Sequence, residues 1–139
     1  MRYATPVLGG VLINLLVSWI LSHIAPAPES ATELQSMASF GPVSYFLVFF
    51  SIIVLAPVIE EWIFRGFLWY TLSNVFNEKI VLFLVSIIFA ACHLDPTLII
   101  GLLPISFFLG WLKMTTGGVK QSIIAHIAHN ATGVLITIL

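Results

Sequence analysis

Charged residues divide the chain into long apolar runs. The uncharged stretches cover residues 3–28, 34–59, 66–77, 80–94, 96–112 and 121–139. A membrane-spanning helix needs roughly 20 mostly apolar residues to cross a hydrocarbon core of about 30 Å. The pattern predicts five spans, near residues 6–25, 43–76, 79–94, 97–113 and 120–139. The third and fourth are short, so we expect neighbouring helices to shelter them in part.

Polar and turn-forming residues separate these spans. Residues 26–42 hold two prolines, two glutamates and four serines or threonines before Gly41-Pro42, which is typical of a water-exposed loop. Further turns are predicted at 74–79, 95–96 and 115–118. The expected fold is therefore all-α, a polytopic transmembrane helix bundle of about five spans that forms one integral membrane domain over residues 1–139.

Composition supports a bilayer environment. Of the 139 residues, 60% are hydrophobic and 8% are charged, whereas soluble domains carry about 25% charged residues. Five Lys and Arg against six Asp and Glu leave no basic patch for nucleic acid, and one cysteine excludes a disulfide scaffold. The candidate functions are those of a membrane protein.

The basic residues predict the orientation. Arg2, Lys79, Lys113 and Lys120 fall in the segments on one side of the predicted bundle, whereas segments 26–42 and 95–96 contain no Lys or Arg. Cytoplasmic segments carry an excess of Lys and Arg. We therefore expect a cytoplasmic N-terminus.

Three charges lie deep in the second span. Glu60, Glu61 and Arg65 each cost at least a few kcal/mol there unless they are paired or hydrated, so they are candidate functional residues. Glu61 and Arg65 are four residues apart and can pair on one helix face. Glu60 lies about 100° around the helix from Glu61 and has no such local partner. Pro57 predicts a break or kink just before this pair, which would place it in the first turn of a restarted helix.

Polar residues of other spans are available to Glu60. His93 ends the third span, and His126 and Asn130 share one face of the last. A Glu–His pair can act as a general base on water, and a His–Asn pair can stabilise an oxyanion. Glu60, His93 and His126 would equally make a three-ligand metal site with an open position. The remaining histidines, His23 and His129, are interpreted as helix–helix hydrogen-bonding residues.

Three motifs carry a family resemblance. They are APVIEEWIFRGFLW (56–69), FAACH (89–93) and SIIAHIAHN (122–130). In order and spacing the chain resembles the CPBP family of intramembrane proteases, which includes the CAAX prenyl endopeptidases of the Rce type and bacteriocin-processing and immunity relatives. The similarity covers about residues 52–135, a CPBP-like protease core.

The resemblance implies roles for these residues. Glu60 is expected to activate water with help from His93, and His126 and Asn130 to stabilise the oxyanion. Glu61 and Arg65 are expected to shape the site. The mechanism stays open between a glutamate-dependent one without a cofactor and one with a divalent metal such as Zn²⁺, for which Glu60, His93 and His126 would be the ligands.

The leading hypothesis is an intramembrane endopeptidase. Its expected substrate is a membrane-associated, prenylated or bacteriocin-like peptide or small protein, and its expected location is a bacterial or archaeal plasma membrane. A homo-oligomer that completes the substrate cleft is a further expectation. The alternative is a non-catalytic bacteriocin self-immunity or partner-binding protein, in which Glu60→Gln keeps function. A proton or ion relay ranks last, because few ionisable groups lead from Glu60 to either face.

Overall fold

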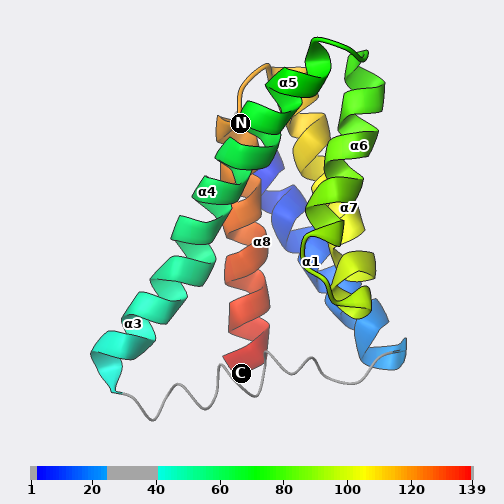
Figure 1. Cartoon of the computed structure of the whole chain (residues 1–139). Helices are drawn as coiled ribbons and strands as arrows, with labels where there is room; N and C mark the ends of the chain where they lie inside the picture. The colour runs from blue at the N-terminus through cyan, green and yellow to red at the C-terminus, as the bar shows by residue number, and fades with distance from the viewer. Residues whose placement is uncertain (1–2, 25–40, 139) are drawn as a thin grey trace.

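The computed structural model describes residues 3–24 and 41–138, and all regular structure in these ranges is helical. Four of the helices are α1 (Ala4–Ile24), α6 (Glu78–Ala91), α7 (Pro96–Thr116) and α8 (Lys120–Ile138). The remaining one is a continuous helix, Pro42–Ser73. Figure 1 shows these helices side by side as a bundle. The predicted all-α helix bundle is confirmed, with five helices in the described ranges.

Three helices are long and apolar enough to cross a membrane: α1, Pro42–Ser73 and α7. Large apolar side chains such as Leu12, Trp19 and Phe67 lie exposed on them, as expected of surfaces that face lipid. These features identify an integral membrane protein. The 14 residues of α6 rise only about 21 Å, so the prediction of a short third span is confirmed.

The fourth span is longer than predicted. Helix α7 has 21 residues and includes Thr115 and Thr116, which the sequence placed in a turn. Their hydroxyls donate to the Trp111 and Leu112 carbonyls at 2.8 and 2.7 Å, which supports one more helical turn. The helix ends at Gly117, whose φ of 73° is the left-handed conformation that glycine adopts readily.

The sequence predicted a break or kink at Pro57, and of these the break with a restarted helix is wrong. The long helix runs without interruption through α3 (Pro42–Phe50), η2 (Ser51–Leu55), α4 (Ala56–Glu61), η3 (Trp62–Leu68) and α5 (Trp69–Ser73), of which η2 and η3 are π-helical. In η2 the chain winds more widely, and the N–H of Ala56 bonds to the Ser51 carbonyl five residues back. This wider turn accommodates the proline without ending the helix. Glu60 and Glu61 consequently lie mid-helix and gain nothing from a helix N-terminus.

Helix α8 lies at the centre of the packing. It contacts α1, α7, η2 and α4, while α6 pairs with α7. Helix α1 approaches α8 closely at Gly10, where a Cβ atom would overlap the Ala125 carbonyl oxygen. The α3 end of the long helix diverges from the bundle in Figure 1 and buries no residue. The polar residues of the second and last spans therefore face each other where α4 meets α8.

Candidate active site

A fully buried ion pair lies inside the long helix. Arg65 Nη1 donates to Glu61 Oε1 at 2.9 Å, and neither side chain is exposed to solvent. The pair expected from their four-residue spacing is confirmed. Because each charge compensates the other, both can remain ionised away from water.

Arg65 is also tied to the neighbouring helices α6 and α7. Its Nη2 donates to the backbone carbonyl and to the hydroxyl of Ser106, at 2.9 and 2.7 Å. Ser106 and Ser86 donate to each other's carbonyls at 3.1 and 3.2 Å, and the guanidinium lies 4.4 Å from the centre of the Phe89 ring. Sequence reasoning missed both serines. Their signal was a small polar residue within an apolar span, a residue type that often bonds across helices.

His126 lies between the two glutamates. Its Nδ1 is 3.1 Å from Glu61 Oε1, and its Nε2 is 3.7 Å from Glu60 Oε2. An ionised Glu61 accepts hydrogen bonds only, so it favours a proton on His126 Nδ1, the nitrogen that faces it. The Glu60 side chain is 30% exposed. An accessible carboxylate and the Nε2 of the imidazole thus face each other, just beyond direct hydrogen-bond distance.

Asn130 binds the backbone of the long helix. Its Nδ2 donates to the Ile52 carbonyl at 3.0 Å. This carbonyl needs a donor because the Ala56 N–H bonds to Ser51 instead, and the next residue, Pro57, has no N–H. The amide keeps one further N–H, and therefore one donor for the oxyanion role that the sequence suggested.

The Phe89 ring lies close to both His93 and His126. The Phe89 ring centre is 5.2 Å from that of His93 and 5.6 Å from that of His126. His93 Nδ1 is 3.0 Å from the Phe89 carbonyl, to which it can only donate, so Nε2 is the free acceptor. In the described ranges, no hydrogen bond or ion pair joins His93 to Glu60.

The three ligands suggested for a metal are not gathered around one point. Within residues 3–24 and 41–138, no group of three His, Cys, Asp or Glu side chains is arranged to hold a metal ion. Glu60 and His126 face each other, but His93 is held by the Phe89 carbonyl.

A comparison with protein-family models identifies the family to which the chain belongs. The model for the Rce1-like type II CAAX prenyl endopeptidases matches residues 42–132, most of the chain. The chain belongs to this Rce1-like family. No curated protein and no solved structure matches it.

The matched range contains every candidate residue of the site. In this Rce1-like chain the long helix supplies Glu60, Glu61 and Arg65, and the two later motifs supply His93 and the His126–Asn130 pair. The match confirms the resemblance to the CPBP intramembrane proteases and associates the polar centre of the bundle with a family of endopeptidases.

Proposed function

We propose that the chain is an intramembrane endopeptidase in which Glu60 and His126 activate a water molecule. One observation carries the proposal: Glu60 Oε2 and His126 Nε2 face each other at 3.7 Å, just beyond direct hydrogen-bond distance. In the tautomer with the His126 proton on Nδ1, both atoms are acceptors, so a donor between them is needed. A water molecule there would donate one hydrogen to each, which leaves its oxygen lone pairs directed away from the pair.

The reaction then follows general-base hydrolysis. The water oxygen attacks the carbonyl carbon of the substrate peptide bond while Glu60 accepts one of its protons. As the C–N bond breaks, the same proton passes from Glu60 to the leaving nitrogen, so the carboxylate is regenerated. His126 orients the water and stabilises the polar transition state in a site away from bulk solvent.

The remaining motif residues complete this scheme. The second N–H of Asn130 is directed to the developing oxyanion, and His93 assists water activation. Glu61 is a positioning residue, because its carboxylate sets the tautomer of His126. Arg65 keeps Glu61 ionised by pairing with it, and Ser106 holds Arg65 in place.

The substrate class follows from the location of the site. The carboxylate and imidazoles lie within an apolar bundle, so we propose a peptide or small protein that reaches them from the bilayer. Prenylated and bacteriocin-like peptides are both in this class. The proposed location remains a bacterial or archaeal plasma membrane, with self-association as a way to complete the substrate cleft.

The test compares peptide termini in host membranes that carry the wild-type chain, Glu60→Gln or Glu78→Gln. Glu78→Gln is the matched control, because Glu78 is an exposed glutamate at the start of α6, outside the site. The proposal expects new termini with the wild type and with Glu78→Gln, and their disappearance with Glu60→Gln at equal protein abundance.

Two outcomes would contradict the proposal. If the same termini persist with Glu60→Gln, this carboxylate is not the general base. If no termini differ while a host phenotype survives the substitution, the non-catalytic partner-binding function takes the place of the protease.

A further inference from the structure

A second polar site lies away from the glutamates, at the end of the bundle where α1 and α8 begin and α7 ends. A half-open cavity of about 660 Å³ occurs there, lined by these three helices and the turn between α7 and α8. Its lining includes Tyr3, which precedes α1, and Thr5 of α1. Thr115 and Thr116 of α7 and Lys120 of α8 also line it. None of the candidate catalytic residues contributes to it.

One wall of the cavity favours an anion. Lys120 Nζ lies 5.3 Å from the centre of the Tyr3 ring. No acidic residue lines the cavity, and none forms an ion pair with Lys120 among the residues that the structure describes. Lys120 is also the first residue of the 19-residue helix α8, whose initial N–H groups add positive potential. A phosphodiester would match this wall, because its negative charge complements the Lys120 cation and its oxygens can accept from the first N–H groups of α8.

Another part of the lining favours a hydrogen-bond donor. The hydroxyl hydrogens of Thr115 and Thr116 are used on helix carbonyls of Trp111 and Leu112, so the two oxygens present only lone pairs to the cavity. They lie in the last turn of α7, the negative end of its helix dipole. The ligand must therefore carry a donor close to its phosphate.

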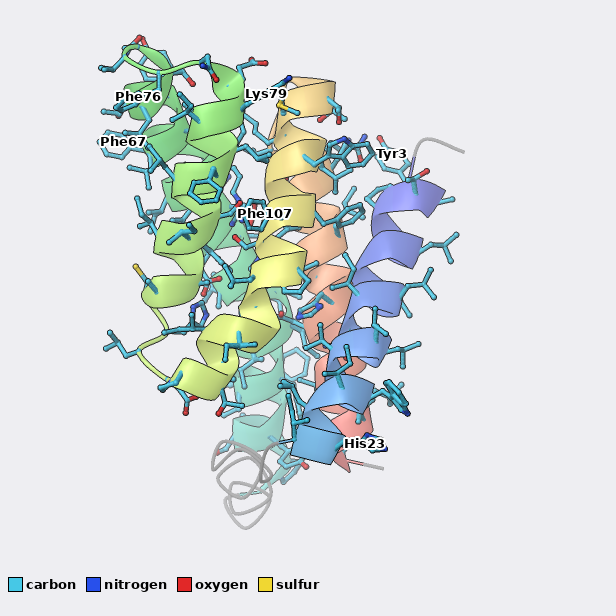
Figure 2. The ribbon with its side chains drawn as sticks, turned by 90° about the vertical axis from the view of Figure 1, so that its right-hand side faces the viewer. Tyr3, His23, Phe67, Phe76, Lys79 and Phe107 are labelled. Carbon is cyan, nitrogen blue, oxygen red and sulfur yellow. The ribbon has the colours of Figure 1, made fainter. Side chains whose placement is uncertain are left out.

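The location of the cavity suits a membrane lipid. Figure 2 shows Tyr3 and Lys79 at one end of the bundle and His23 at the other. Tyr3 and Trp111 both line the cavity, and aromatic residues of this kind prefer the level of lipid headgroups. Pro6 and Leu112 add an apolar part for the beginning of the acyl chains.

We propose that this cavity binds the headgroup of a phospholipid that carries hydrogen-bond donors beside its phosphodiester, such as an ethanolamine or a glycerol headgroup. The phosphodiester lies against Lys120 and the start of α8, and the donors lie against Thr115 and Thr116. A choline headgroup has the same phosphodiester but no N–H or O–H donor, so it binds more weakly. The proposal is independent of the protease activity.

Native mass spectrometry of the delipidated chain in detergent tests the proposal. The probes are phosphatidylethanolamine, phosphatidylglycerol and phosphatidylcholine with identical acyl chains. We expect the first two to be retained severalfold more than the third. Lys120→Gln should weaken them about fivefold, the scale of one lysine at an anionic membrane surface. Lys79→Gln is the matched control, because Lys79 lies at the same end but outside the cavity.

A second variant tests the acceptor wall. Thr115→Val removes one acceptor at an exposed position. It should therefore lower the retention of phosphatidylethanolamine relative to phosphatidylcholine, while the retention of phosphatidylcholine itself stays unchanged. Equal retention of the three lipids, or equal effects of Lys120→Gln and Lys79→Gln, would overturn the proposal. So would glycerophosphoethanolamine binding as tightly as the intact lipid, because the site would then belong to a soluble phosphate compound.

Discussion

Two adjacent glutamates occupy different environments, and this difference assigns them different tasks. Glu61 is fully buried, and one of its oxygens accepts from both Arg65 and His126. Glu60 is partly exposed and faces His126 without a direct hydrogen bond. A carboxylate whose oxygen is used by two donors is suited to orienting other groups. A carboxylate that is accessible and unpaired is suited to taking a proton from water.

The two carboxylates should differ in their effects on stability. Glu61→Gln leaves the Arg65 cation buried without its anion, and loss of one partner of a buried ion pair costs about 3–5 kcal/mol. Glu60→Gln removes no such pair and should leave the chain nearly as stable as the wild type. Denaturant unfolding in detergent micelles measures both variants. Equal stability of the two would show that the ion pair does not stabilise the fold.

At the scale of elements, the π-helical segment η2 explains why Asn130 bonds to the backbone of the long helix. The wider turn sends the Ala56 N–H to Ser51, and Pro57 offers no N–H, so the Ile52 carbonyl has no donor from its own helix. Asn130 of α8 supplies the donor. A proline before the acidic pair and an asparagine 73 positions later are therefore linked through the Ile52 carbonyl, and this bond fixes α8 against the helix that holds Glu60.

This dependence predicts a coupling between two positions. Asn130→Ala should cost about 1–3 kcal/mol of unfolding free energy, because it leaves a partly buried carbonyl of a membrane-spanning helix unsatisfied. In a Pro57→Ala background the cost should be smaller, since residue 57 then has an N–H and the helix can satisfy Ile52 itself. A double-mutant cycle by unfolding in micelles measures the coupling. Strictly additive costs would refute this explanation of Asn130.

At the scale of the whole molecule, the bundle has one basic end. Tyr3 and Lys79 lie at the same end in Figure 2, and the cavity there joins Tyr3 to Lys120. Lys113 is in the last turn of α7, the helix end whose Thr115 and Thr116 line the same cavity. The positive-inside bias predicts that this end faces the cytoplasm. The turn after α6 then faces outward, because α6 starts beside Lys79 and ends at Ala91.

Cysteine labelling tests this orientation. Cys92 is the single cysteine and is exposed in the turn after α6. A membrane-impermeant maleimide should label it in intact cells. A Lys79→Cys chain in a Cys92→Ser background should be labelled only after the membrane is permeabilised. The reverse result would place the basic end outside and the predicted orientation would be wrong.

Much of the fold was predictable because the bilayer imposes it. Long apolar runs must become helices where backbone groups cannot bond to water, so the spans and most of their boundaries follow from the spacing of charges. The exceptions were local. Thr115 and Thr116 extended α7 through hydroxyl bonds to carbonyls, and the helix passed Pro57 by winding more widely. Both depend on hydrogen bonds that composition does not reveal.

The sequence by itself determined that Glu61 pairs with Arg65, because four residues along a helix bring two side chains together at any depth. Only the tertiary structure decided their partners. It brought His126 rather than His93 to the glutamates, directed Asn130 to Ile52, and joined Arg65 to Ser106. Such contacts depend on how helices far apart in the chain rotate and approach, which close packing of many side chains sets and no spacing within one helix encodes.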